Sequence, residues 1–219
     1  MHFMETLTES IIAAGWAERI LTEGQLARLL DGTAQRRYNL VNRALHRGEL
    51  VRLRRGRYRL AASVSGKLAH PFVVAQALRS GSYVSFESAL SFHGWIPEAV
   101  PMTLCVVPGR RREEFEVPQF QTFRFLPLAL NPGFFLEAVE RVQLDEQVAL
   151  VARPLRALLD RLCLLKRDWP GLMELAWEMR IDPDLMASLR RDDLEALRPL
   201  YRHGRMRAAI EAMERELAS

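Results

Sequence analysis

The chain has 219 residues, of which 49% are hydrophobic and 26% are charged. This composition is typical of a globular protein with a buried core and excludes a chain that is disordered throughout. No apolar run approaches the roughly 18 to 20 residues that a membrane span requires, and the first ten residues lack the pattern of a secretory signal. Two cysteines 58 positions apart and five histidines without ligand spacing predict no disulfide framework and no metal site. We therefore expect a cytoplasmic protein without a membrane partner, a metal or another cofactor.

The net charge of +4 is concentrated in one part of the chain. Residues 1–62 contain 11 arginines and 6 acidic residues, a balance of +5, so the remaining 157 residues carry −1. Between Arg28 and Arg59, 10 arginines stand against only Asp31 and Glu49, a balance of +8. Such asymmetry predicts a polyanionic partner for this segment.

Residues 1–62 are expected to form three helices followed by a β-hairpin. The first helix is predicted over residues 8–20 from apolar residues at helical spacing. A second begins at Thr22, where Gln25 completes a capping box, and a third is capped by Thr33 and stops at Gly48. A helical wheel of the third helix predicts a core face and an opposite polar face. The core face holds Ala34, Tyr38, Val41 and Leu45, and the polar face holds Gln35, Arg36, Asn39, Arg43 and His46.

The segment 50–60, LVRLRRGRYRL, alternates apolar residues and arginines on both sides of Arg55-Gly56, which predicts a hairpin. The apolar faces coincide if Leu53 lies opposite Tyr58, and this register pairs Arg54 with Arg57 and Arg52 with Arg59. Like charges directly across a ladder are destabilising. Four arginines on one face therefore favour a ribbon that lies on phosphates.

We expect an α+β protein in which an N-terminal winged helix-turn-helix precedes a mixed α/β domain with a helical C-terminal region. Residues 61–67 are small and polar and predict a linker or a domain edge. Three segments are expected. Residues 1–62 form a DNA-binding domain, residues 63–165 form an α+β regulatory domain, and residues 166–219 are a helical extension of that second domain. Strands are predicted at 83–84, 103–107, 122–126, 135–142 and 147–151, and helices at 71–79, 86–93 and, with breaks at Pro183 and Gly204, from Arg153 onward.

In a winged helix the third helix enters the major groove and the hairpin follows the backbone. Asn and Gln side chains pair bidentately with adenine, and Arg pairs with guanine. The predicted base-reading residues are Gln35, Arg36, Asn39 and Arg43. The predicted phosphate contacts are Thr33, Arg47, Arg52, Arg54, Arg55, Arg57 and Arg59. The alternative is a winged-helix adaptor that binds only protein and keeps its arginines as a solvated face.

The sequence gives little support to a catalytic site. Gly81-Ser82 is typical of the start of a nucleotidyltransferase signature, but the one Asp-x-Asp triplet, at 182–184, lies at an expected helix start, where Asp caps. Ser85, Ser88 and Ser91 share one short helical stretch with His93, and no phosphate loop or GxSxG elbow occurs. The run Arg110–Arg112, followed by two glutamates, predicts a solvated loop, and the alternative is a loop that contacts DNA or a partner. We expect a protein that is not an enzyme.

The hairpin, together with four later segments, resembles the AbiEi-type antitoxins of type IV abortive-infection toxin–antitoxin systems. The later segments are Tyr83–Ser85, Ser88–Gly94 (SALSFHG), Thr103–Pro108 and Pro154–Asp160 (PLRALLD), and the resemblance covers about residues 20–165. It implies a cytoplasmic bacterial autorepressor that binds double-stranded DNA at inverted repeats in its own promoter. It also implies an antitoxin whose functional partner is a nucleotidyltransferase-like toxin encoded beside it. The family is not enzymatic, and no PD…(D/E)xK nuclease pattern occurs.

Overall fold

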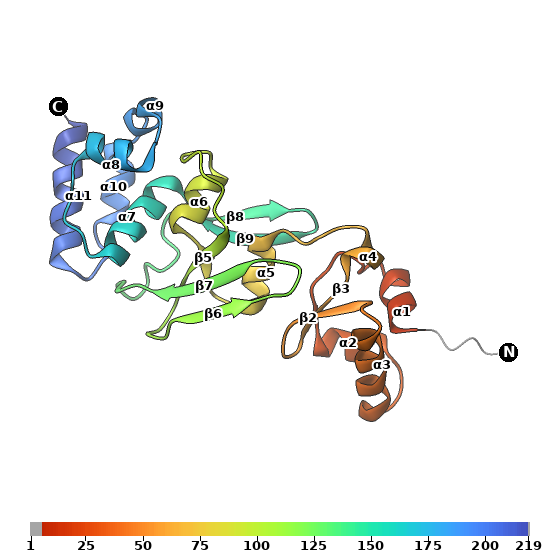
Figure 1. The fold of residues 1–219 in the computed structure, drawn as a ribbon. Coiled ribbons are helices and arrows are strands. Elements are labelled where there is room, and N and C mark those ends of the chain that lie inside the picture. Colours follow the sequence, from red (N-terminus) through yellow and green to blue (C-terminus); the bar gives the residue numbers. More distant parts are fainter. Residues whose placement is uncertain (1–5, 219) are drawn as a thin grey trace. The chain divides into compact units, whose positions relative to one another are not determined.

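A computed structural model describes residues 6–218 of the chain (Figure 1). These residues form a mixed α+β protein with eleven helices and two β-sheets. The chain divides into two compact units. Unit 1 contains the described residues up to Ser80 together with Gln143–Val148, and unit 2 contains Gly81–Val142 and the residues from Ala149 onward.

Unit 1 is built from helices around a small antiparallel sheet with the strand order β1-β3-β2. The apolar residues of its core come from α1, α2, α3 and all three strands, and Ile11 and Leu21 are fully buried among them. The elements are α1 (Leu7–Ala13), β1 (Leu21–Thr22), α2 (Glu23–Leu29), α3 (Ala34–His46), β2 (Leu50–Arg54), β3 (Arg57–Leu60), α4 (Ala62–Ser65) and α5 (Pro71–Leu78).

The predicted starts of α2 and α3 are confirmed. Thr22 Oγ1 accepts from the backbone N–H of Gln25, whose side chain returns to the N–H of Thr22. Thr33 caps α3, and the helix stops before Gly48, which has a φ of +68° that a glycine adopts without strain. The first helix is shorter than predicted, because the chain turns at Gly15 with a φ of +72°.

The core face predicted for α3 is wrong at its N-terminal end. Ala34 is exposed, and the Tyr38 side chain is 62% exposed. The packed side of the helix is centred on buried Ala44, with Val41 and Leu45 half-buried beside it. At 3.6 residues per turn Tyr38 lies about 120° from Ala44, so it points away from the core.

The hairpin forms with its turn at Arg55-Gly56 as predicted, but its register changes within β2. Arg54 pairs with Arg57 as expected, whereas Arg52 lies opposite Tyr58 and Val51 lies opposite Arg59. The predicted pairings of Arg52 with Arg59 and of Leu53 with Tyr58 are therefore wrong. A β-bulge places two residues of β2 opposite one of β3 and moves Arg59 to the other face of the ribbon from Arg52.

Residues 61–67 are not an extended linker. They contain α4, and Ser65 Oγ donates to the carbonyl oxygens of Ala61 and Lys67 at 3.1 and 3.0 Å. The unit boundary consequently falls at Ser80 instead of residue 62, because α5 also packs against β2. The helical extension predicted at 166–219 belongs to unit 2 together with most of residues 81–165.

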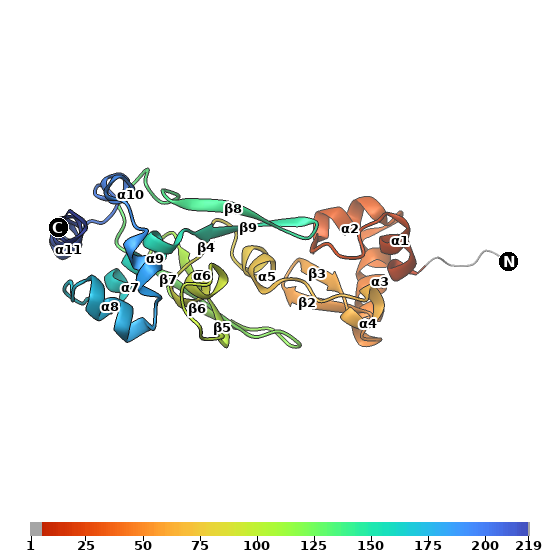
Figure 2. The same cartoon turned by 90° about the horizontal axis from the view of Figure 1, so that it is seen from above.

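Unit 2 contains a six-stranded mixed sheet with the order β6-β7-β5-β4-β9-β8. The β5–β7 and β4–β9 pairs are parallel, whereas the β4–β5 and β6–β7 pairs are antiparallel. The strands are β4 (Tyr83–Val84), β5 (Met102–Val107), β6 (Glu113–Glu116), β7 (Thr122–Pro127), β8 (Val139–Leu144) and β9 (Gln147–Ala152). In Figure 2, β8 and β9 form a long ribbon, and its tip, Gln143–Val148, belongs to unit 1.

The helices of unit 2 assemble around α7, which packs against α6, α10 and α11 (Figures 1 and 2). Helix α6 also packs on β5. The helices are α6 (Phe86–Phe92), α7 (Pro154–Leu165), α8 (Leu172–Met179), α9 (Pro183–Ala187), α10 (Arg191–Leu197) and α11 (Gly204–Leu217). Within residues 6–218, no helix is long and apolar enough to cross a bilayer.

One strand of the sheet was not predicted. The two glutamates after Arg112, expected in a solvated loop, begin β6, which pairs with β7. Glu114 accepts from Arg124 Nε at 2.7 Å, and the Phe115 ring packs edge-on against Phe125 at 5.7 Å. Charged residues at an edge strand remain in water, so this strand carries little of the apolar pattern from which strands are predicted.

Candidate nucleic-acid interface

The polar face of α3 presents an exposed stripe of three side chains one helical turn apart: Gln35, Asn39 and Arg43. Gln35 Nε2 donates to Asn39 Oδ1 at 3.1 Å, so each amide orients the other while both remain exposed. The structure therefore brings together three of the four residues predicted to read bases. Their donors and acceptors are of the kind that pairs with base edges in a major groove.

The fourth predicted base reader, Arg36, is held back against the turn that precedes α3. Its Nη1 donates to the Asp31 carbonyl oxygen at 3.0 Å, and the neighbouring Arg37 Nη1 donates to Gly32 at 2.5 Å. Thr33 Oγ1 accepts from the backbone N–H of Arg36 at 3.2 Å, which fixes the first turn. Both arginines donate hydrogen bonds to backbone carbonyl groups of this turn, so their positive charges remain there.

The hairpin arginines do not form the single face that alternation predicted. Arg52 is exposed and lies over the Tyr58 ring, with its Cζ 5.7 Å from the ring centroid. Arg54 donates to the carbonyl oxygen of Leu78 at the end of α5. Arg55, at the turn, is exposed, and Arg57 is half-buried. These four arginines remain candidates for phosphate contacts.

Arg59 is the clear exception among the predicted phosphate contacts, because its side chain is only 2% exposed. Its guanidinium donates to the carbonyl oxygens of Leu60, at 3.1 Å, and Lys67. Burial lowers the pKa of Arg59, while the charge of Glu18 raises it in part. The assignment of Arg59 to phosphate is therefore corrected: this arginine ties β3 to the segment after α4 and has no surface to offer a ligand.

Arg47, the last of the predicted phosphate contacts, has an acidic neighbour. Its Nη1 lies 3.9 Å from Glu49 Oε1, at the outer limit of an ion pair, and its side chain is 56% exposed. The other oxygen of Glu49 accepts from Thr8 Oγ1 at 2.7 Å. Because the Arg47 pair is long and exposed, it contributes little to stability and leaves this guanidinium able to meet a phosphate.

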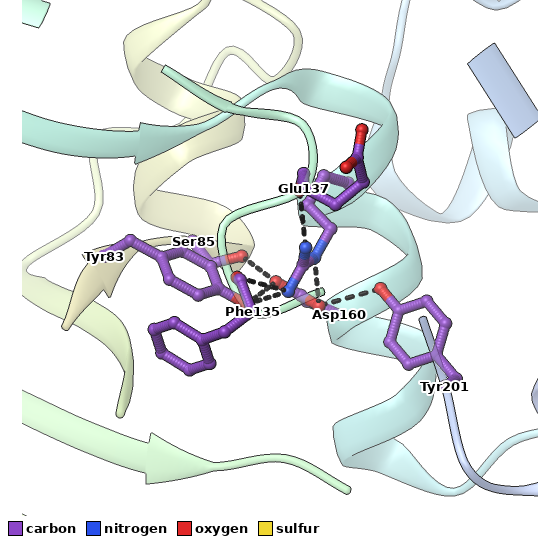
Figure 3. A network of polar contacts seen from close by, with 7 residues as sticks. Tyr83, Ser85, Phe135, Glu137, Asp160 and Tyr201 are labelled. Atoms are coloured by element: carbon purple, nitrogen blue, oxygen red, sulfur yellow. Dashed lines mark hydrogen bonds and ion pairs between the residues drawn. The ribbon is translucent and has the colours of Figure 1, made fainter. Parts of the chain in front are cut away.

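Unit 2 contains a second polar cluster, which lies in its core (Figure 3). Asp160 Oδ1 accepts from Arg156 Nε at 2.9 Å and from the Tyr201 hydroxyl at 2.8 Å. Its Oδ2 accepts from the hydroxyls of Tyr83 at 2.9 Å and Ser85 at 2.7 Å. All four lone-pair positions of the carboxylate are thus used, as a buried charge requires.

The charges of this cluster are fixed by its surroundings. Burial would lower the pKa of Arg156, but the charge of Asp160 and its hydrogen bond to the guanidinium raise it above its ordinary value. Burial, followed by the charge of Asp160, raises the pKa of Tyr83 and of Tyr201 well above the ordinary range. The arginine is therefore charged and both phenols are neutral, which describes a structural ion pair without a proton to exchange.

The sequence indicates part of this cluster, although the leucine pattern of α7 draws attention to an apolar helix face instead. Arg156 and Asp160 lie four residues apart in a helix that is otherwise almost entirely apolar, which is the spacing of a helical ion pair. The partners Tyr83, Ser85 and Tyr201 come from distant parts of the chain, and only the tertiary fold reveals them.

The serines and the histidine of the segment 85–93 have separate structural partners. Ser88 Oγ donates to the Met102 carbonyl at 3.1 Å and accepts from the Leu104 N–H at 2.9 Å, while Ser91 Oγ donates to Glu98. His93 Nε2 lies 3.0 Å from the Ala152 carbonyl oxygen. Asp182 caps α9, as predicted. In the described part of the chain, no three metal-ligating side chains come together.

Comparison of the chain with models of known protein families and with curated proteins finds no match.

Proposed function

We propose that unit 1 is a winged helix-turn-helix domain through which the protein binds duplex DNA as a transcriptional repressor. Three features support the fold: the order α1-β1-α2-α3-β2-β3, the short turn between α2 and α3, and the sheet order β1-β3-β2. In such a domain α3 enters the major groove and the hairpin follows the phosphates.

One observation carries the proposal. Of the ten arginines between residues 28 and 59, nine are exposed or half-buried, and the acids of this segment are only Asp31 and Glu49. A surface with this excess of positive charge costs self-repulsion in the free protein and gains from a polyanion. The exposed amides of Gln35 and Asn39 supply base-reading groups beside these charges.

Within this proposal, Asn39, Gln35 and Arg43 read bases from one stripe of α3. Arg36 and Thr33 lie at the start of the helix, where the backbone of the duplex passes. The exposed hairpin arginines Arg52 and Arg55 contact phosphates, supported by Arg47, Arg54 and Arg57. Arg59 has no part in binding.

Salt dependence tests the proposal against a winged-helix adaptor that binds only protein. A fluorescence anisotropy titration would use the duplex upstream of the gene as probe. If about six phosphates are neutralised, affinity falls on the order of a thousandfold between 50 and 200 mM salt. An affinity for duplex DNA that does not change with salt concentration would favour the adaptor.

We further propose that the protein is the antitoxin of a type IV toxin–antitoxin system and that unit 2 neutralises a nucleotidyltransferase-like toxin. The proposal is supported by the resemblance to AbiEi-type antitoxins. Two of the segments that carry this resemblance also contact each other, because the hydroxyls of Tyr83 and Ser85 donate to Asp160. The test co-expresses the full chain with the toxin encoded beside it and measures growth. An Arg43→Ala, Arg55→Ala variant should lose DNA binding and still restore growth.

A further inference from the structure

A cleft of about 630 Å³ opens in unit 2 at the edge of the sheet where β5 and β7 end. Because β5 and β7 are parallel neighbours, their carboxyl ends, at Val107 and Pro127, lie at the same edge. The loops that follow them, which include Arg110 and residues 128–133, form two of the walls. This is the position at which many proteins with parallel strands bind ligands, and the volume is in the range of about 300–1,000 Å³ typical of ligand sites.

The lining of the cleft is positively charged on an otherwise neutral unit. Among its described lining residues, Arg110 and Arg202 are charged and none is acidic, and most of the rest are apolar, proline or glycine. Both arginines are exposed. A concave site with two guanidinium groups and apolar walls is suited to a ligand that combines an anionic group with an apolar or planar body.

The backbone around Arg202 is held in place by hydrogen bonds to the opposite loop. The N–H of Arg202 donates to the Ala129 carbonyl at 3.0 Å, and the N–H of Asn131 donates to the Leu200 carbonyl at 2.7 Å. Asn131 Nδ2 also donates to the Pro199 carbonyl at 2.6 Å. The two segments therefore form one wall of fixed backbone, from which the Arg202 side chain projects.

The buried ion pair is hydrogen-bonded to Phe135 and Glu137 and to Tyr201, which lie in or next to the lining of the cleft (Figure 3). Arg156 donates to the carbonyl oxygens of Phe135, at 3.5 Å, and Glu137, at 2.6 Å, and Phe135 lines the cleft. Asp160 holds the hydroxyl of Tyr201, the residue before Arg202. A buried ion pair is seldom the most stable way to fill a core, so its use here fits a site whose walls must be held in one arrangement.

We propose that this cleft binds a phosphorylated small molecule of nucleotide size, with its phosphates between Arg110 and Arg202 and its apolar part against Pro127 and Phe135. Arginine is the side chain that best matches phosphate oxygens in a bidentate geometry. A DNA duplex presents its phosphates along an extended surface, so it does not match a concave volume with apolar walls. The site lies wholly in unit 2, and its test is independent of DNA binding by unit 1.

The test measures binding to the full-length protein by isothermal titration calorimetry in 150 mM salt. ATP and inorganic pyrophosphate are the probes, and adenosine is the uncharged control. Two variants, Arg110→Ala and Arg202→Ala, remove one guanidinium each from separate segments. Arg112→Ala is the matched control, because it removes the same charge from the loop of Arg110 but does not line the cleft.

We expect saturable binding of one ATP per chain, at least about tenfold weaker in Arg110→Ala and in Arg202→Ala, since each loses a charged hydrogen-bond partner. Arg112→Ala should change affinity less than threefold, roughly the scale of an exposed charge. Circular dichroism would verify that each variant is folded. If one of the two cleft variants is unfolded, the affinity of the other for ATP is still sufficient to test the proposal. Three results would each overturn the proposal: no saturable binding at millimolar ATP, equal weakening in all three variants, or displacement of ATP by excess duplex DNA.

Discussion

Arg156 and Asp160 face each other one turn apart on α7, with Nε and Oδ1 separated by 2.9 Å and both side chains completely buried. The pair links elements that are far apart in sequence, because its remaining hydrogen-bonding groups contact β4, the segment before β8 and Tyr201. Unit 2 is therefore organised around a charge pair instead of an entirely apolar core.

Removal of the carboxylate charge should destabilise unit 2 strongly. Asp160→Asn leaves the Arg156 guanidinium buried without its counter-charge, and breaking one partner of a buried pair costs about 3–5 kcal/mol. Urea unfolding followed by tryptophan fluorescence would measure this loss, since Trp95, Trp169 and Trp177 all belong to unit 2. Asp168→Asn, the same substitution at an exposed position, should leave the unfolding curve unchanged.

The two cysteines should be slow to react in the folded protein. Burial, and then the charge of Asp160, raises the pKa of Cys163 to about 11. Relative to an ordinary thiol, the thiolate fraction at pH 8 is lower by roughly a hundredfold. Burial also raises the pKa of Cys105 far above its ordinary value. Alkylation located by mass spectrometry should be slow at both sites until urea unfolds the protein, and rapid labelling of folded Cys163 would contradict its burial.

The same shift predicts a loss of stability at alkaline pH. The folded state holds the Cys163 proton more tightly than the unfolded chain does, so this thiol stabilises the fold below the unfolded pKa. That contribution disappears as the pH rises from about 9 toward 11, and the free energy of unfolding should fall over this interval. A Cys163→Ala variant should show a smaller fall. An identical pH dependence in the variant would remove Cys163 as its cause.

Local features of unit 1 could be predicted from the sequence because short-range chemistry decides them. The caps at Thr22 and Thr33 and the turn at Arg55-Gly56 depend on residues a few positions apart, and all three are confirmed. The bulge in β2 depends on tertiary packing, and strict alternation cannot reveal it. Arg59, whose type and spacing match its neighbours, lies in the interior because its guanidinium is bonded to the carbonyl oxygens of Leu60 and Lys67, a contact that only the fold reveals.

The order of the strands in unit 2 could not be predicted from the sequence, because it also depends on tertiary contacts. Five of the six strands were predicted, at least in part, yet their order and direction depend on pairings between distant segments. Glu113–Glu116 was missed because an edge strand needs few apolar residues. The charge excess that defines the candidate interface was visible in the composition, whereas the partners of each arginine required the fold.

Substitution in the α3 stripe should change sequence preference more than overall affinity. Asn39→Ala removes an amide suited to adenine and should relax discrimination at one base pair by about 1–3 kcal/mol. Anisotropy titrations would compare the upstream duplex with single-base-pair substitutions and with a scrambled duplex. If Asn39→Ala weakens binding to every duplex equally, this side chain positions the protein and does not read bases.

Arg55 and Arg59 provide a matched pair that separates charge at the surface from charge in the interior. Arg55→Ala should weaken all duplexes alike and lower the slope of log affinity against log salt by about 0.9, the value for one phosphate contact. Arg59→Ala should leave the slope unchanged, because this side chain is 2% exposed and bonded to the carbonyls of Leu60 and Lys67. The loss of those hydrogen bonds should instead cost roughly 1–3 kcal/mol of stability. Hydrogen exchange of the hairpin amides would detect that cost, and a salt slope lowered by Arg59→Ala would show that Arg59 reaches the DNA after all.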